Sequence, residues 1–398
     1  MRFKRLILPG DFVEAFLYFD FLWLVHEAGD VWAFDIAACM HAKFPSDADT
    51  ATMVFARNDL LSSNSTFENF EDFSPAVRAF IDQGDVELTR EELERFSRIF
   101  DTKIDARSVL DMRCYYSRAY IATEKSVVQF KLFGRDQLAH VSVGARANGQ
   151  LGGVKVHDAK CLQFRSQYGV ISAACGTDGA WYAREASSGL DTGWTAKFEK
   201  FATVSHATEF VADRLTSIAS FKKLDVFRTK RQNSNRIQTK PPIDSGSEVT
   251  EREEITEVSG IDEDIEAGVA KELSQASSTV EFPPVKLFLT RNVLFAFHAN
   301  AAVTTIRLAD HGEVVAPRAR QVSKSPGPVL SSSTSSLGLL IELDEAVCVL
   351  SGNRWQQIYD GPVYSVRGYP GAKWYRRLVT AVGDGRTELI FSATERRT

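Results

Sequence analysis

Histidine is the side chain best suited to metal binding and acid–base chemistry near neutral pH, and the chain has seven of them. None falls in an H-x-H or H-E-x-x-H spacing, which would place two imidazoles on one metal ion. The sequence also lacks the G-x-S-x-G turn of serine hydrolases, the phosphate-binding P-loop and a G-x-G-x-x-G after a strand. These patterns predict no catalytic residue, no metal and no cofactor.

Glycoside hydrolysis needs only two carboxyl groups, and carboxylates are plentiful at the turns of this chain. Aspartate is common at turns for a local reason, because its side chain hydrogen-bonds to the neighbouring backbone. The turn carboxylates therefore leave an enzyme as an open alternative, whereas a protein without catalytic activity is favoured. They are Glu27, Asp30, Glu124, Asp178, Asp344 and Asp384.

Composition and charge narrow the function classes. The 398 residues are 44% hydrophobic and 25% charged, close to globular averages, so we expect a sizeable buried core. A net charge of −5 argues against a protein that coats nucleic acid, which needs a basic field over its binding face. The apolar run before Pro9 is too short for a signal peptide, and no long uncharged stretch follows. We therefore expect a cytoplasmic protein with no membrane partner.

The five cysteines are widely spaced and include no C-x-x-C pair of the kind that binds zinc or cycles between redox states. We expect all of them to be buried, reduced thiols. They are Cys39, Cys114, Cys161, Cys175 and Cys348.

The elements that must position any site follow a repeated pattern of paired strands. Seven segments each combine an alternating apolar run, a short polar or glycine-bearing turn and a second run with an aromatic or β-branched residue, which is typical of antiparallel hairpins. The segments are FLWLVHEAGDVWAFDI (21–36), AYIATEKSVVQFKL (119–132), YGVISAACGTDGAWYARE (168–185), RLTSIASFKKLDVFRT (214–229), NVLFAFHANAAVTTIRL (292–308), LGLLIELDEAVCVLSGNRWQQIYD (337–360) and RLVTAVGDGRTELIFSA (377–393).

The spacing of the seven turns is close to that of propeller blades, which take about 40 to 50 residues each. Two intervals are longer, and both contain a segment of different composition. We place the turns near Gly29, Glu124, Thr177, Phe221, Asn300, Gly352 and Gly383. The pattern predicts an all-β fold, a seven-bladed β-propeller spanning 1–398 with a small helical insertion and a long charged loop.

The chain resembles a β-propeller of the tryptophan-aspartate-repeat kind. The segments VWAFD, AWYARE and RWQQIYD keep an aromatic residue, which places Trp32, Trp181 and Trp355 on the third strands of their blades. The Gly-His and Trp-Asp dipeptides of that family are absent. The segment Arg2 to Leu8 alternates in the manner of a strand that completes the last blade beside TELIFSA. Two β-sandwiches joined by an acidic linker would also give many short strands.

The first insertion, 55–106, changes to a helical period. Ser74 and Pro75 favour the start of one helix, and Thr89 with Glu92 forms a capping box that favours a second. On that second helix three apolar residues share one face, and this face packs on the blades or binds a partner. They are Leu93, Phe96 and Phe100.

The second insertion, 231–284, joins a basic run to a strongly acidic one. Such a composition predicts a flexible loop whose deletion, from Asn233 to Ser278, leaves the fold intact. The basic run contacts phosphates or pairs with the acidic loop beside it, and we favour the pairing. The basic residues named as candidate contacts are Lys222, Lys223, Arg228, Lys230 and Arg231.

These observations favour a non-enzymatic scaffold or adaptor that presents propeller loops to a protein partner. This step is one of analogy, because a fold does not determine a function. A propeller-type hydrolase acting on a glycan or small molecule is one alternative. An adaptor that binds single-stranded nucleic acid through the basic run, 222–240, is the other, and the net acidity of the chain disfavours it.

Overall fold

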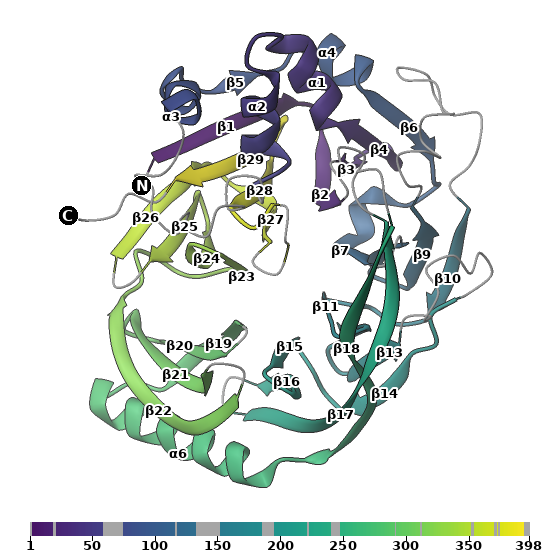
Figure 1. Cartoon of the computed structure of the whole chain (residues 1–398). Coiled ribbons are helices and arrows are strands. Elements are labelled where there is room, and N and C mark those ends of the chain that lie inside the picture. Colours follow the sequence, from purple (N-terminus) through teal and green to yellow (C-terminus); the bar gives the residue numbers. More distant parts are fainter. Residues whose placement is uncertain are drawn as a thin grey trace. The chain divides into compact units, whose positions relative to one another are not determined.

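The computed structural model describes residues 2–18, 21–58, 75–115, 118–132, 152–184, 195–220, 223–239, 247–290, 292–310, 313–351, 354–369, 372 and 375–393. In these residues the strands form seven sheets, six of four strands and one of five, in which strands consecutive in the chain are mostly neighbours (Figure 1). The fold is a seven-bladed β-propeller, as the hairpin spacing predicts. The chain divides into two compact units.

The first unit takes the two ends of the chain, Met1–Arg107 and Val329–Thr398, and holds three blades. Its first blade is β2 (Phe12–Tyr18), β3 (Phe21–His26), β4 (Asp30–Asp35) and β6 (Ser97–Asp101). The next is β23 (Ser331–Ser335), β24 (Gly338–Leu343), β25 (Ala346–Ser351) and β26 (Arg354–Asp360). The last is β27 (Val363–Gly368), β28 (Leu378–Gly383), β29 (Arg386–Ala393), β1 (Arg2–Pro9) and the short β5 (Val86–Glu87).

The second unit, Ser108–Leu132 with Gly152–Pro328, holds four blades. Two of them are β7 (Val109–Tyr115), β8 (Arg118–Thr123), β9 (Val127–Lys131) and β10 (Gly153–His157), and then β11 (Gln163–Gln167), β12 (Val170–Ala174), β13 (Ala180–Arg184) and β14 (Glu199–Ala202). The other two are β15 (Ala207–Val211), β16 (Arg214–Ser220), β17 (Lys223–Thr239) and β18 (Ser247–Ile261), and then β19 (Pro284–Thr290), β20 (Val293–His298), β21 (Ala302–Asp310) and β22 (Glu313–Lys324).

The N-terminal strand completes the C-terminal blade, which confirms the predicted role of Arg2 to Leu8. Strand β1 runs antiparallel to β29, with Leu6 opposite Leu389. The side chains of Leu6, Leu8 and Leu389 are fully buried. Lys4 shares this face of β1, is 1% exposed and donates to the Phe80 carbonyl at 2.8 Å, so the buried face is not purely apolar. Strand β5 then adds to the far edge of β1 in parallel and covers part of it.

The middle strands of every blade match the predicted hairpins, with one turn misplaced. Strands β24 and β25 are joined by Asp344 and Glu345, whereas the sequence interpretation set this turn near Gly352. Trp32 and Trp181 lie on the third strands β4 and β13, as expected, but Trp355 lies on the fourth strand β26. The true turn contains no glycine, and Gly352 lies outside the described residues.

Among the described residues between β4 and β6, the structure has four α-helices, namely α1 (Ile36–Lys43), α2 (Ala48–Phe55), α3 (Pro75–Asp82) and α4 (Arg90–Arg95). Helix α3 begins at Pro75 and α4 begins with the Thr89–Glu92 capping box, as predicted; Ser74 lies outside the described residues. Two corrections apply. The helical segment starts at Ile36 and not near Phe55. Helix α4 ends at Arg95, because 97–101 pairs with β4 as β6, which places Phe100 opposite Val31 on a strand.

The segment 231–284 is not an irregular loop in its described part. It contains most of β17, all of β18 and α6 (Glu263–Val280). Helix α6 buries Ile265, Val269, Leu273 and Ala276, which recur at helical spacing. Deleting Asn233 to Ser278 would remove β18 and this apolar face, which contradicts the premise that the segment makes few native contacts; the outcome of the deletion stays a prediction.

Within the described residues, no helix is both long and apolar enough to cross a bilayer.

Candidate functional site: the charged β17–β18 arm

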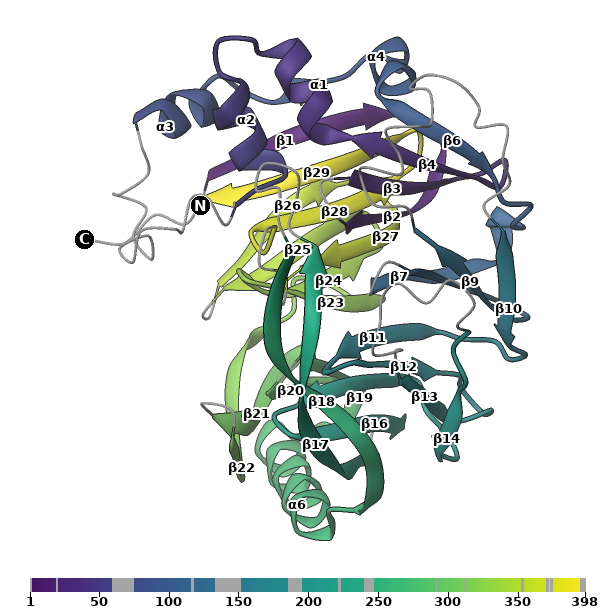
Figure 2. The ribbon, with the colours of Figure 1, turned by 45° about the vertical axis from the view of Figure 1, so that its right-hand side comes forward.

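Most of the basic residues predicted as contacts lie on β17, the third strand of its blade. Strand β17 pairs with β16 only between Lys223 and Arg228. From Thr229 to Thr239 it pairs with β18 alone, over Ser247 to Val258. We call this two-stranded extension, 229–239 with 247–258, the arm. At about 3.3 Å per residue the arm is roughly 35 Å long, and it leaves the other strands of its blade as a twisted ribbon (Figures 1 and 2). Lys222 lies outside the described residues.

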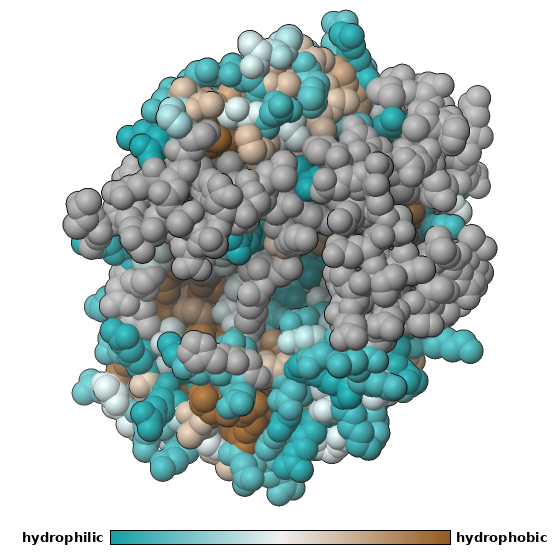
Figure 3. Space-filling model, viewed as in Figure 1, coloured by the Kyte–Doolittle hydropathy of each residue, from teal (hydrophilic) through white to brown (hydrophobic). Residues whose placement is uncertain are grey.

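Opposite charges face each other across the arm. The Lys230 ammonium lies 2.6 Å from a carboxylate oxygen of Glu257, and the two residues are also partners in the ladder. The Arg231 guanidinium lies 2.6 Å from Glu253. Opposite charges at neighbouring positions of a strand pair stabilise its register. The predicted pairing of the basic run with the acidic segment is therefore confirmed for these residues. On the molecular surface, hydrophilic residues predominate over the lower part of this blade (Figure 3).

The base of the arm carries a second group of ion pairs. The buried Asp262 carboxylate accepts a hydrogen bond of 2.8 Å from Arg214 and lies 3.5 Å from Arg228. Burial opposes ionisation, but the two guanidinium groups outweigh it and lower the pKa of Asp262. Lys223 contacts Asp225 at 2.8 Å, and this hydrogen bond raises the pKa of the lysine. The described candidate cations of β17 each have an acidic partner.

Contacts to other strands hold the proximal part of the arm. The Ile255 amide donates to the Tyr168 carbonyl at 2.9 Å, and its side chain packs in an apolar cluster with Val170 and Phe210. Arg231 lies over the Tyr168 ring, 4.0 Å from its centroid, and also donates to the Ala212 carbonyl. These contacts attach the base of the arm, around Arg231 and Ile255, to the neighbouring strands.

Helix α6 covers edges of the two blades on either side of it. It lies along β22 and near β17 (Figures 1 and 2). Its Glu266 accepts from the Val226 amide at 2.9 Å, and Glu272 accepts from the Ala319 amide at 2.6 Å. Burial raises the pKa of Glu266. Since an uncovered strand edge invites pairing with other chains, α6 protects the blades and leaves the arm to extend.

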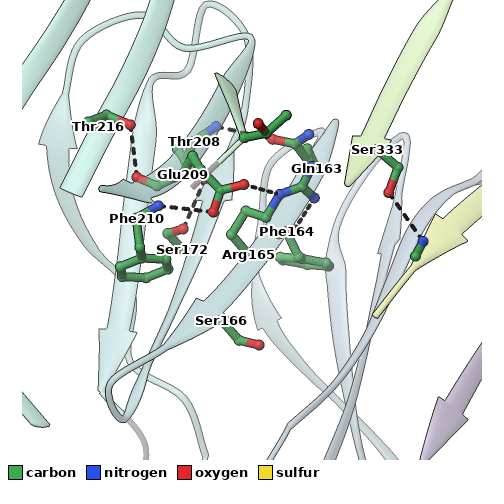
Figure 4. Close-up of polar contacts among 12 residues, drawn as sticks. Gln163, Phe164, Arg165, Ser166, Ser172, Thr208, Glu209, Phe210, Thr216 and Ser333 are labelled. Carbon is green, nitrogen blue, oxygen red and sulfur yellow. Dashed lines mark hydrogen bonds and ion pairs between the residues drawn. The ribbon is translucent and has the colours of Figure 1, made fainter. Parts of the chain in front are cut away.

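A repeated carboxylate, which the sequence interpretation missed, joins neighbouring blades within each unit. Glu209 of β15 accepts from its neighbour Phe210 N–H at 3.0 Å and from Arg165 of the preceding blade at 3.1 Å (Figure 4). Glu14 of β2 accepts from Ala15 N–H and from Arg367 of β27, both at 2.8 Å. Each acid lies among apolar residues on the first strand of its blade. The sequence signal is a single acidic residue inside an apolar run, as in FVEAF and ATEFV. These carboxylates are structural.

The turn carboxylates are distributed over five blades. Glu27 and Asp30 flank the β3–β4 turn, and the other four, Glu124, Asp178, Asp344 and Asp384, lie one each at the corresponding turns of other blades. Across the described residues there is no group of three or more His, Cys, Asp or Glu side chains placed to hold a metal ion.

The apolar residues of the helical insertion turn inward. Leu93 is 1% exposed and Phe100 2% exposed, and Phe96, half-buried, contacts the Arg95 guanidinium. Because Leu93 and Phe100 are buried, little of either side chain is accessible to a protein partner.

Comparisons with known proteins agree with the fold. No protein-family model matches the chain, and no curated protein matches it. Among solved structures, the chain is similar to the β-propeller domain of Cps50 (Swd1) from Myceliophteria thermophila, at 11% identity and a TM-score of 0.45, covering 97% of this chain and 98% of that one. It is also similar to the WD40 β-propeller domain of Doa1 and the N-terminal domain of Nup159, each at 9% identity, a TM-score of 0.44 and coverage of 97% and 91%. These are similarities of fold.

Proposed function

We propose that the protein is a non-enzymatic interaction scaffold that binds a protein partner through the arm. The observation that carries the proposal is the length of β17 and β18, 17 and 15 residues, against 4 to 9 residues for the other strands of their unit except β22. Strand β18 is the fourth strand of the blade, but only Ile261 of β18 pairs with the part of β17 that is bonded to β16, so nearly all of the β17–β18 ladder extends beyond β16.

The energetics of a two-stranded ribbon support this reading. Ordering each residue costs about 1 to 2 kcal/mol of conformational entropy, and an isolated hairpin without a core offsets this only marginally. The arm places its apolar anchor, Ile255, at the base, and its exposed ion pairs, such as Lys230–Glu257, are worth roughly 0 to 1 kcal/mol each. An element that adds so little to folding is best explained by a contact outside the chain.

The charges of the arm indicate a polar partner surface. Basic residues on β17 are matched by acidic residues on β18, and acidic residues outnumber basic ones over the arm as a whole. A protein surface of mixed charge fits such a ribbon, and its affinity should fall with salt.

Affinity capture from the native host tests the proposal. In the arm-shortened variant an Asn-Gly turn replaces 234–252, so that Asn233 and Glu253 remain paired at the new end. A control variant, Lys155→Gln with Asp158→Asn, removes an exposed ion pair from β10 and the turn after it. We expect a protein that is recovered with the intact chain and the control but at least tenfold less with the arm-shortened variant. Equal recovery from all three, or turnover of a small substrate by the purified chain, would contradict the proposal.

Nucleic-acid binding is distinguished by salt and by two substitutions. Because Lys230 and Arg231 are paired with Glu257 and Glu253, the intact chain should bind single-stranded DNA weakly. Glu253→Gln with Glu257→Gln frees both cations and should increase that binding severalfold, measured by fluorescence anisotropy. Tight binding by the intact chain, with a log–log salt slope of about −0.7 per contacted phosphate, would instead favour the nucleic-acid adaptor.

A further inference from the structure

Two cysteines meet at the open end of the β11–β12 hairpin. Cys161 precedes β11 and Cys175 follows β12, and the Leu162 amide donates to the Ala174 carbonyl between them at 2.7 Å. The two thiols are close enough to affect each other's pKa, the Cys161 thiol donates to the Gln163 carbonyl at 3.5 Å, and both cysteines are free. They belong to one apolar cluster, in which Cys161 is 0% and Cys175 3% exposed. The fold therefore holds a dithiol in a fixed place.

An imidazole completes this cluster. His157, the last residue of β10, interacts with the Cys175 thiol. Its ring lies 4.6 Å from Trp181 and 5.2 Å from Phe198, measured between centroids. Its Nε2 atom is buried and has no hydrogen-bond partner in the part of the chain that the structure describes. A histidine held in this way beside a thiol can stabilise a thiolate.

The two thiols differ in acidity. The hydrogen bond from Cys161 lowers the pKa of Cys175; burial opposes this, and His157 adds to the lowering. Burial raises the pKa of Cys161, and the neighbouring Cys175 raises it further. The lowered pKa of Cys175 and the raised pKa of Cys161 favour Cys175 as the attacking cysteine and Cys161 as the resolving one.

Cys175 also lies directly beneath an exposed turn. Its N–H donates to the Gly179 carbonyl at 2.7 Å and its carbonyl accepts from Asp178 at 3.0 Å, which fixes the backbone around it. Thr177 and Asp178, within three residues, are exposed. Gly179 has a φ of +100°, and a Cβ there would lie 2.2 Å from the Ala202 carbonyl, so the tight turn depends on this glycine. The exposed turn therefore lies next to Cys175 in the chain.

We propose that Cys161 and Cys175 are an oxidative modification site at which a small peroxide forms a disulfide between them. The Cys175 thiolate attacks one peroxide oxygen and the O–O bond breaks, which gives a sulfenic acid and, after protonation, water. The Cys161 thiol then displaces the hydroxyl from the sulfenic sulfur, which forms the disulfide and a second water. The two cysteines lose two electrons and two protons, and the peroxide is reduced to two waters.

The other cysteines provide internal comparisons. Burial raises the pKa of Cys39 to about 12 and raises the pKa of Cys348. Neither has the thiolate character on which peroxide attack depends, so each should resist at neutral pH.

Peptide mapping of the intact chain tests the proposal without any substitution. Cleavage after Lys160, Arg165 and Arg184 places Cys161 and Cys175 in separate peptides, 161–165 and 166–184, each with one cysteine. After treatment with hydrogen peroxide at pH 7 and alkylation under denaturing conditions, we expect these peptides to be linked at least tenfold faster than Cys39 or Cys348 is oxidised. Because the pKa of Cys175 is lowered, its rate of oxidation should begin to fall at a lower pH than the rate for an ordinary thiol.

Substitutions locate the two roles. In Cys161→Ser the sulfenic acid on Cys175 has no resolving thiol and should be trapped by dimedone, whereas Cys348→Ser should leave the linked peptides unchanged. Absence of the linked peptides from the oxidised intact chain, or oxidation of Cys175 no faster than that of Cys348, would overturn the proposal.

Discussion

Individual buried charges in this protein are stabilising only as pairs. Glu14 accepts hydrogen bonds from Ser365 at 2.6 Å and from Arg367 at 2.8 Å, and both charged residues are less than a tenth exposed. Removing one member of a buried pair leaves the other charge without its counter-ion in a poorly solvated place, and the cost exceeds what the pair itself contributes.

Glu14→Gln should therefore lower the free energy of unfolding by about 3 to 5 kcal/mol, measured by urea denaturation. The matched control is Glu94→Gln, which removes the exposed partner of Arg90 on α4 and should change stability by less than about 0.5 kcal/mol. Equal effects of the two substitutions would show that Arg367 finds solvent or another partner.

The acidity of Asp262 predicts a pH dependence at the base of the arm. Its folded-state pKa is lowered, so the unfolded chain binds the proton more readily, and the stability that this carboxylate contributes is present above its unfolded pKa and lost as the pH falls through the folded one. Asp262→Asn should cost about 1.5 to 3 kcal/mol at pH 7. The difference from the wild type should shrink as the pH falls below about 4, measured by urea unfolding across that range. A difference that stays constant to pH 3 would assign the effect to packing.

At the scale of elements, helix α6 supports two blades through one apolar stripe. Leu273 is 5% exposed within a cluster that includes Ile218 and Leu308. Leu273→Ala should cost about 2 to 5 kcal/mol, whereas Lys271→Ala on the exposed face should cost less than about 0.5 kcal/mol, both measured by thermal or urea unfolding. A negligible effect of Leu273→Ala would mean that α6 is not part of the core.

Local patterns predicted the strands well and the insertions less well. Alternation located the middle hairpin of every blade because two adjacent strands and their turn lie within one short window of sequence. The β24–β25 turn escaped because Asp344–Glu345 has no glycine or proline, and β6 was included in a helix because Leu93, Phe96 and Phe100 also fit a helical period.

Contacts that depend on strand register could not be read from the sequence. Taken alone, the high negative charge of the acidic segment predicts a loop, because like charges oppose ordering. In the structure, cations on β17 stabilise β18, as in the Lys230–Glu257 ion pair. Cys161 and Cys175 meet only because the β11–β12 ladder returns the chain to its start. They are the two cysteines nearest to each other in the sequence, but this separation alone does not predict that their side chains meet.

At the scale of the molecule, seven blades provide a stable support and the arm provides the distinguishing surface. Three kinds of contact stabilise the blades within their own units. Carboxylates on first strands, such as Glu209, accept hydrogen bonds from a neighbouring blade, β1 pairs with β29, and α6 covers strand edges. The arm extends beyond the part of its blade that β16 supports, and the proposed function depends on it.

The most direct measurement is site-specific photo-cross-linking in the native host. A photoreactive residue replaces Gln232, which is exposed on the arm, or, as the control, Lys155, which is exposed on β10 of the same unit. The account predicts a discrete cross-linked protein from position 232 that is absent from position 155 and that is lost when 234–252 is replaced by Asn-Gly. Cross-linked species that are the same from both positions, or none from position 232, would contradict the claim that the arm binds a protein partner.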